Sequence, residues 1–397
     1  MTLIKKLIKR FLQFILLLLI VANLFVILSG RFYLYKGAFH TYLKGRTGPS
    51  IYDKDIFAFS TLKKSNSIYK WIEKKKQKSL TTKEEKFITS LSSSSFLVFK
   101  NDTLIFEKYW NGHKKNTVSN SFSAAKTFIA LMVGIALGEN KIKSLDEPVG
   151  NYISEFKSGH KRKITIRHLL MMASGLDWEE SAKNPLSENA ESYYGTDLWG
   201  LTTRQKAIEK PGVRFNYQSG NSQLLGFIIQ KATGKNVSEY AYEKIWSKIG
   251  TDHDAYWSLD KENGAEKSFC CLYGTSRDFA RLGKLIAQNG KWESRQIIPE
   301  YFMKELFSNP RINTDEHIKN YRYGLHIWTY LGDKNPVYYC RGILGQYIIT
   351  IPKEKLIIVR TGEKRMENIE VSSNKYKIGH PADIFHYISI AKHLAKN

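Results

Sequence analysis

Cysteine, proline and acidic residues are scarce in this chain of 397 residues. It contains three cysteines and nine prolines, and 37 acidic residues stand against 61 lysines and arginines. The cysteines, Cys270, Cys271 and Cys340, have neither the spacing of a disulfide framework nor that of a metal site. We expect no bridge between the adjacent Cys270 and Cys271. A pairing of either one with Cys340 in an oxidising compartment stays open.

The shortage of acidic residues gives a formal net charge of +24. A basic chain of this kind sometimes binds nucleic acid or another acidic surface. Here the lysines are spread along the whole chain, often beside acids, and neither a zinc spacing nor an RNP-like aromatic motif accompanies them. We therefore expect no nucleic-acid partner and interpret the charge as a solvated basic surface, near anionic lipid or cell wall.

One long hydrophobic run, residues 11–28, lies at the N-terminus and is broken only by Gln13 and Asn23. Its 18 residues exceed the roughly 7–15 of a signal-peptide core and approach the roughly 20 of a spanning helix. Four basic residues precede it, and neither a clean small-x-small cleavage pattern nor a lipobox cysteine follows. We therefore predict that residues 1–30 form an uncleaved signal anchor. The alternatives are a cleaved signal peptide and a buried core helix. The rest of the chain is then expected outside the cytoplasm, at a bacterial inner membrane and in the periplasm.

Beyond the anchor, residues 31–90 form a charged and then serine-rich stretch that we interpret as a lead-in of helix and loop. Residues 91–397 have the pattern of a folded domain. Two short apolar strands flank Asn101-Asp102, a hairpin signal, and two more lie close together near the C-terminus, in "QYIITIPKEKLIIVRTG". Helical patterns fill the middle of the domain and end the chain. This order predicts an α+β fold with one antiparallel sheet built from both chain ends, flanked by helices, with a mainly helical insert.

Ser123 and Lys126 lie one turn apart at the head of an apolar helix, in "SFSAAKTFIALMVGIALG". The spacing alone says little, since the chain has seven other Ser-x-x-Lys matches, which begin at Ser60, Ser67, Ser154, Ser158, Ser258, Ser372 and Ser389. Only Ser123 begins a long apolar helix after a hairpin and loop. A buried lysine loses affinity for its proton and becomes a base for a neighbouring hydroxyl. The alternative is an N-capping serine followed by a surface lysine.

Three further stretches accompany this pair, in order: "ITIRHLLMMASGLDWEE", "PGVRFNYQSGNSQLLGFIIQKATG" with Tyr217, and "CRGILGQYIITIPKEKLIIVRTGE" with a glycine-rich bend. Together they resemble the serine β-lactamase-like hydrolases over about residues 90–395. That family includes class C β-lactamases, D-alanyl-D-alanine carboxypeptidases, related esterases and 6-aminohexanoate-dimer hydrolase. The last of these branches looks most similar to this chain.

The resemblance implies a role for each motif. The Ser-x-x-Lys motif falls on Ser123 and Lys126, and the Tyr-x-Ser motif falls on Tyr217 and Ser219. Ser123 attacks a carbonyl, while a neutral Lys126 and Tyr217, hydrogen-bonded to it, move the protons. The backbone N–H groups of Ser123 and Ile343 hold the oxyanion. Substrate contacts are expected from Ser219, Gly342, Ile343 and Gly345. The expected reaction cleaves a small ester or amide through an acyl-enzyme and needs neither a metal nor an organic cofactor.

The third family motif, usually Lys-Thr-Gly or His-x-Gly, falls on Cys340, Arg341 and Gly342, so the usual cation is missing. A second match, Arg360 to Gly362, lies at the far end of the following strand and is rejected. Arg341 is expected on the face of its strand opposite Cys340. The departure disfavours D-Ala-D-Ala carboxypeptidase or β-lactamase activity, which stays an alternative, as does a catalytically silent wall-binding module. Pocket walls are expected from residues 178–200, including Tyr193 and Tyr194, and from 305–335. The oligomeric state is left open.

Overall fold

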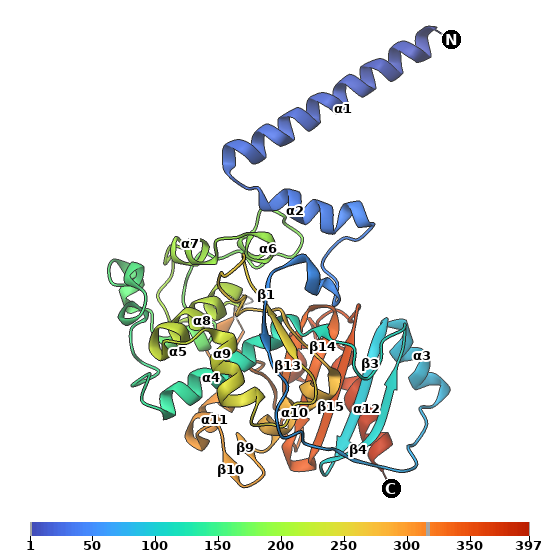
Figure 1. Cartoon of the computed structure of the whole chain (residues 1–397), viewed down its shortest axis with the longest axis vertical. Helices are drawn as coiled ribbons and strands as arrows, with labels where there is room; N and C mark the ends of the chain where they lie inside the picture. Colours follow the sequence, from blue (N-terminus) through green and yellow to red (C-terminus); the bar gives the residue numbers. More distant parts are fainter. Residues whose placement is uncertain (1, 315–317, 397) are drawn as a thin grey trace.

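A seven-stranded sheet forms the centre of the body in the computed structural model, which describes residues 2–314 and 318–396. All neighbouring strands are antiparallel except the last pair, β4 and β2. The order is β12 (Trp328–Tyr330), β13 (Val337–Gly342), β14 (Gln346–Ile351), β15 (Leu356–Gly362), β3 (Ser93–Lys100), β4 (Thr103–Tyr109) and β2 (Ile72–Glu73). Because β15 pairs with β3, the two ends of the chain meet in the middle of the sheet, as predicted (Figure 1).

Turn chemistry explains the predicted β3–β4 hairpin. Asn101 and Asp102 both have positive φ, 49° and 60°. Asparagine and aspartate tolerate this left-handed region better than most residues, and two such residues in succession match the twist of a hairpin. The hairpin prediction is confirmed.

Helices cover both faces of the sheet. On one face lie α3 (Thr82–Ser90) and α12 (Asp383–Ala395), and on the other lies α10 (Ser276–Ala287). Gly283 of α10 lies so close to the sheet that a Cβ there would meet Ile357 Cγ2 at 2.8 Å. The apolar helix α4 (Ala125–Gly138) packs against α8 (Ser219–Thr233) and is buried along almost its whole length. The remaining helices of the insert and its flank are α5 (Ile166–Leu170), α6 (Glu188–Tyr194), α7 (Leu198–Thr203), α9 (Val237–Ala241) and α11 (Glu300–Phe307). The predicted α+β architecture is confirmed.

A second, four-stranded sheet lies beside α4 and runs in the order β1 (Phe59–Leu62), β7 (Ala255–Ser258), β8 (Leu272–Gly274) and β5 (Ser119–Asn120). Two small pairs complete the strands: β9 (Lys291–Trp292) with β10 (Arg295–Gln296), and β6 (Arg214–Phe215) with β11 (Asn313–Thr314). Both β1 and β2 come from residues 31–90. The lead-in therefore contributes a strand to each large sheet, in addition to the helix and loop that its composition indicated.

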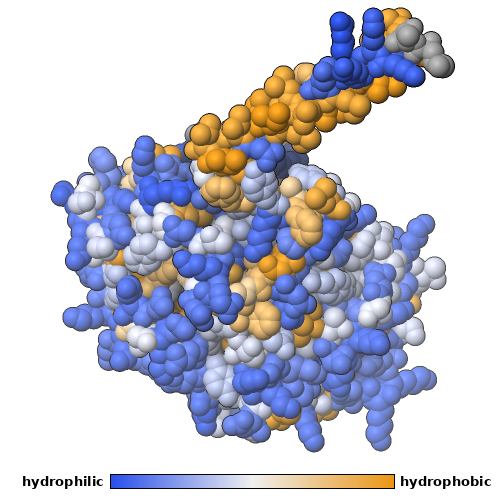
Figure 2. All heavy atoms as spheres, turned by 45° about the horizontal axis from the view of Figure 1, so that its top comes forward, coloured by the Kyte–Doolittle hydropathy of each residue, from blue (hydrophilic) through white to orange (hydrophobic). Residues whose placement is uncertain are grey.

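The N-terminal helix α1 (Thr2–Ser29) projects away from the body (Figure 1). Residues Leu3–Ser29 are long and apolar enough to cross a membrane, and only 6% of an 18-residue apolar stretch within them is buried, so α1 is not a helix of the core. Its 28 residues correspond to about 42 Å, which exceeds a hydrocarbon thickness of about 30 Å. Figure 2 shows the apolar surface along α1 and the hydrophilic side chains near its free end. The helix α2 (Tyr33–His40) lies at its base and packs along α6.

Candidate active site

Ser123 lies in a single 3-10 turn, Phe122–Ala124, that leads into α4 and borders a cavity of about 430 Å³. The preceding residue, Phe122, has a φ of 45°, an uncommon value for a bulky side chain. Its backbone N–H donates to Asn120 Oδ1 at 2.8 Å, which holds this conformation. Backbone strain of this kind costs about 1–3 kcal/mol and tends to occur at functional sites. The turn leaves the Ser123 side chain partly exposed to the cavity, while its neighbours on α4 are buried.

Lys126 lies beneath Ser123 and is only 1% exposed. Its amine donates to Ser123 Oγ at 3.1 Å, to Ser219 Oγ at 3.0 Å and to the Phe269 carbonyl at 2.7 Å. Burial lowers the pKa of Lys126 to about 8, against the opposing effect of the Glu180 carboxylate. The predicted one-turn spacing therefore produces a desolvated lysine in direct contact with the Ser123 hydroxyl.

Tyr217 lies just before α8 and borders the same cavity as Ser123. The phenol is hydrogen-bonded to Ser123, and burial, reinforced by the charge of Glu180, raises the pKa of Tyr217 far above its usual value. Its ring faces the Lys126 amine at 5.2 Å from the centroid and packs on Tyr323 and Trp328. The expected hydrogen bond between Tyr217 and Lys126 is thus replaced by two others, from Lys126 to Ser219 and between Tyr217 and Ser123. The phenol stays protonated at neutral pH.

Glu180 is a member of the site that the sequence patterns did not single out. Its Oε1 accepts from Ser219 Oγ at 2.6 Å, and its Oε2 accepts from the Ser219 N–H at 2.6 Å and from Trp178 Nε1 at 2.8 Å. Burial raises the pKa of Glu180, while Lys126 and the donors from Ser219 oppose the rise. Because the Ser219 hydroxyl donates its hydrogen bond to this carboxylate, the Ser219 oxygen is free to accept from Lys126.

The end of β13 forms the opposite wall. A Cβ at Gly342 would lie 2.2 Å from the Ser121 carbonyl oxygen, so only glycine lets this strand approach the turn that carries Ser123. Gly342 and the half-exposed Ile343 border the cavity. Gly345 has a φ of +84°, and its carbonyl accepts from Arg360 at 2.8 Å. Gly345 therefore shapes the bend and is not among the described residues that line the cavity.

The two residues before Gly342 face opposite sides of the sheet, as expected. Cys340 is fully buried against α4, where the Thr127 side chain is hydrogen-bonded to it. The Arg341 guanidinium lies 3.3 Å from the centroid of the Trp328 ring, and Arg341 borders the cavity. The rejected match at Arg360 is also buried, and its guanidinium donates to the carbonyls of Leu91, Leu344 and Gly345. Arg360 therefore has a structural role.

The expectation of no bridge between Cys270 and Cys271 is wrong, because the structure joins them in a disulfide and leaves Cys340 as a buried free thiol. The chain turns sharply here, and Cys271 has a φ of 67°. The same turn presents the Phe269 carbonyl to Lys126. The disulfide therefore lies within the segment that holds the lysine, and Cys270 borders the cavity.

The cavity has a roof that the sequence did not indicate. Residues 180–194 contribute one wall, as expected, and include Tyr193 and Tyr194. No described residue of 305–335 lines the cavity. In their place, α2 and the turns that follow it contribute Tyr33, Leu34, Gly37, Ala38, Thr41, Tyr42, Thr47, Gly48 and Pro49. The lead-in thus closes the site from above.

Comparisons with known proteins agree with this fold. The family model described as Beta-lactamase matches residues 81–368. The chain is 22% identical over 294 residues to the 6-aminohexanoate-dimer hydrolase of Paenarthrobacter ureafaciens, covering 70% of this chain and 74% of that protein. It is 26% identical over 301 residues to the teichoic acid D-alanine hydrolase of Staphylococcus aureus (strain MRSA252), covering 68% and 70%.

Solved structures show the same fold. A Bacillus anthracis protein with the provisional name 6-aminohexanoate-dimer hydrolase superposes with a TM-score of 0.74 at 22% identity, covering 87% of this chain and 93% of its own. A penicillin-binding protein homologue from Pyrococcus abyssi superposes with a TM-score of 0.58 at 21% identity, covering 79% and 77%. With the family match extending over most of its length, the chain belongs to the beta-lactamase family and is a serine hydrolase.

Proposed function

We propose that this protein is a membrane-anchored hydrolase with its catalytic domain outside the cytoplasm, and that it cleaves a small ester or amide through an acyl-enzyme on Ser123. Neutral Lys126 takes the Ser123 proton as the Ser123 oxygen attacks the carbonyl carbon. The oxyanion is held by the backbone N–H groups of Ser123 and Ile343, each worth on the order of 3 kcal/mol of the barrier. Water then attacks the acyl-enzyme and releases the acid.

The proton steps divide between two residues. The raised pKa of Tyr217 keeps its phenol protonated, so this group acts as the donor to the leaving oxygen or nitrogen. In deacylation the Tyr217 phenolate takes a proton from the attacking water, and Lys126 returns its proton to the Ser123 oxygen as the acid leaves. Ser219, fixed by Glu180, keeps the Lys126 amine in place between these steps.

The observation that carries the proposal is the position of the Lys126 amine. It is buried, its pKa is lowered to about 8, and it lies 3.1 Å from a serine hydroxyl that borders a cavity. The membrane location is supported by α1, which is long and apolar enough to span a bilayer.

Two relatives indicate substrates to test. One is named a teichoic acid D-alanine hydrolase and the other a 6-aminohexanoate-dimer hydrolase. The buried Cys340 thiol occupies the position of the cation that penicillin-recognising relatives use, which disfavours β-lactam and D-Ala-D-Ala substrates. A panel of p-nitrophenyl acetate, D-alanyl esters, a 6-aminohexanoate dimer and nitrocefin distinguishes these classes.

A fluorophosphonate probe tests the nucleophile on the full chain in detergent micelles. Labelling is expected in the wild type and in Ser158→Ala, whose serine begins another Ser-x-x-Lys match on an exposed loop. Labelling is expected to disappear in Ser123→Ala. Labelling that persists in Ser123→Ala would exclude Ser123 as the nucleophile, and a wild type without labelling or turnover would favour a catalytically silent binding module.

A further inference from the structure

The roof of the cavity is a helix with two different faces. Residues 33, 34, 37, 38 and 41 point toward the cavity or toward α6, at the spacing of one helical face. The Tyr33 hydroxyl donates to the Pro185 carbonyl at 3.1 Å, and Arg31 donates to the Leu186 carbonyl at 2.9 Å. A Cβ on Gly37 would lie 3.4 Å from the Tyr194 ring. These contacts fix α2 on the same segments that form the cavity wall.

The other face of α2 is apolar and exposed. Tyr35 and Phe39 lie four residues apart on α2, while Phe32 directly precedes the helix and Leu43 lies in the 3-10 turn Tyr42–Lys44 after it. We refer to these four residues as the outer stripe. Their exposed fractions are 57%, 44%, 56% and 76%. Four large hydrophobic side chains that are exposed within twelve residues form the kind of patch that marks an interaction surface. Figure 2 shows hydrophobic side chains where α1 meets the body.

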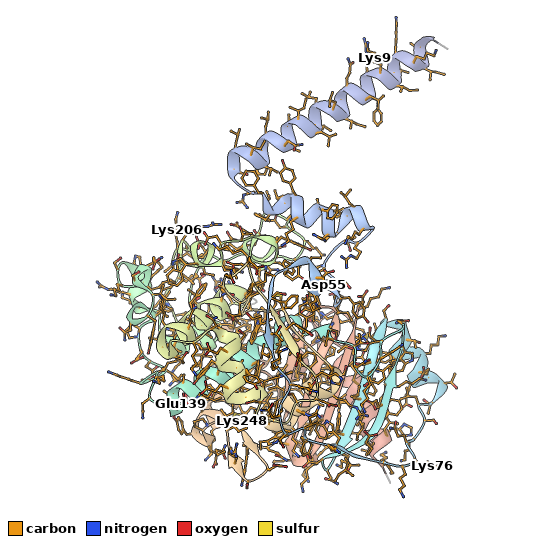
Figure 3. The ribbon with its side chains drawn as sticks, viewed as in Figure 1. Lys9, Asp55, Lys76, Glu139, Lys206 and Lys248 are labelled. Carbon is orange, nitrogen blue, oxygen red and sulfur yellow. A yellow bond between two sulfur atoms is a disulfide. The ribbon has the colours of Figure 1, made fainter. Side chains whose placement is uncertain are left out.

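The position of the outer stripe in the chain indicates what covers it. Helix α1 ends at Ser29, three residues before the stripe begins at Phe32. The Tyr35 hydroxyl donates to Asn23 Oδ1 on α1 at 2.7 Å, so the stripe is joined to the last turns of the candidate span. At the other end of α1, Figure 3 shows Lys9 far from the body. A helix that directly follows a span and carries aromatic side chains outward suits the boundary between headgroups and acyl chains.

We infer that the outer stripe of α2 lies in the membrane interface, so that the cavity is held at headgroup level and takes amphiphilic esters or amides whose apolar chain stays in the bilayer. The substrate part of this inference rests on the proposed function, whereas the docking part does not. Leu34, Ala38 and Tyr42 carry apolar surface from the outer stripe to the cavity, because they border the cavity from α2 and the turn after it. The same helix therefore contacts lipid on one face and substrate on the other.

Insertion is tested with full-length protein in nanodiscs of phosphatidylcholine and phosphatidylglycerol. Leu43→Cys, labelled with an environment-sensitive fluorophore, reports on the outer stripe. Ile72→Cys is the matched control, since Ile72 is 64% exposed and Lys76, four residues later, lies at the opposite end of the body from α1 in Figure 3. Because the native cysteines are buried or paired, the label reports the introduced site. We expect a spin-labelled headgroup lipid to quench the label on Leu43→Cys at least threefold more strongly than that on Ile72→Cys. Equal quenching would overturn the docking.

Substrate access is tested with the double variant Phe39→Glu/Leu43→Glu and the matched control Ile72→Glu. None of these residues borders the cavity. We expect the double variant to lose at least fivefold in kcat/KM on p-nitrophenyl laurate dissolved in the nanodisc, and less than twofold on p-nitrophenyl acetate. Equal losses on both esters, or no loss on either, would overturn the inference about substrate. Failure of the proposed function would instead appear as a wild type that a fluorophosphonate does not label, whatever the quenching result.

Discussion

Lys126 and Lys267 are both buried almost completely, but their surroundings differ. Lys126, at the head of α4, touches two hydroxyls and a carbonyl and has Glu180 nearby. Lys267 is also fully buried, and burial lowers its pKa to about 7. Its amine donates to the carbonyls of Ser192 and Tyr193 at the end of α6 and faces the ring of Phe57.

These two lysines show that a lowered pKa does not by itself indicate a catalytic role. Both lysines are poised to lose a proton near neutral pH, and Lys267 is the more strongly shifted. Only Lys126 has a serine hydroxyl within reach and a cavity above that serine. Lys267 instead interacts with backbone carbonyls at a helix end, where a cation is favoured. Geometry therefore decides which buried lysine serves chemistry.

The largest expected effect separates the two lysines directly. Lys126→Met removes the base while keeping much of the side-chain volume, and we expect kcat/KM on p-nitrophenyl acetate to fall at least about 10³-fold. Lys267→Met, the matched control, should lose less than about tenfold. Steady-state kinetics on folded protein, checked by circular dichroism, measures both. Comparable losses in the two variants would contradict the assignment of Lys126, and not Lys267, as the catalytic base.

The second largest expected effect is the change in the wild-type kcat/KM with pH. Lys126 must be neutral to accept a proton, so kcat/KM should rise with pH by roughly tenfold per unit below the pKa and level off above about pH 8. Rates between pH 6 and 10, with correction for spontaneous hydrolysis, give the value. A flat profile across this range would mean that no group with the pKa of Lys126 controls the reaction.

The substitution Glu180→Gln tests how the surroundings of Lys126 set its pKa, because the Glu180 carboxylate lies near this lysine. The substitution removes a negative charge that raises the pKa of Lys126, so the rising limb of kcat/KM should move to lower pH. Glutamine has one acceptor oxygen in place of two, so Ser219 loses one of its two bonds and activity at the plateau should fall about tenfold. A limb that stays in place or moves upward would argue against this coupling.

The smallest effect concerns stability. The folded-state pKa of Lys267 lies below its ordinary value of about 10.5, so the unfolded chain binds more protons between about pH 7 and 10. The penalty for burying this charge is complete below pH 7 and is relieved as pH rises through that window. We expect the thermal midpoint of Lys267→Met to gain less than the wild type, by a few degrees, between pH 7 and 9. Parallel midpoints in the two proteins would contradict a charge-burial penalty at Lys267.

Much of this fold followed from local patterns. The Asn101-Asp102 hairpin and the paired C-terminal strands carry strong turn and alternation signals. The continuous apolar surface of α4 predicted a buried helix, and that burial is what desolvates Lys126. The helical pattern is weaker around α5, which ends at Leu170 and is followed by irregular backbone.

What could not be predicted depends on contacts between distant segments. Glu180 acts through Ser219, 39 residues further along the chain, and nothing in the local sequence distinguishes it from the adjacent Glu179. The bridge between Cys270 and Cys271 depends on a backbone turn that composition does not encode. The roof of the cavity comes from residues 33–49, and nothing in their sequence indicates that they pack against α6.

The contacts of Arg31 and Tyr33 set a limit on how the protein can mature. A peptidase that cut directly after Gly30 would free the body from α1 and leave the bonds to Pro185 and Leu186 intact. A cut twenty residues later would also remove one side of the cavity. A form cut from α1 that keeps the whole cavity must therefore retain Arg31 and the residues after it, and comparing the activity of chains that begin at Arg31 and at Ile51 tests this requirement.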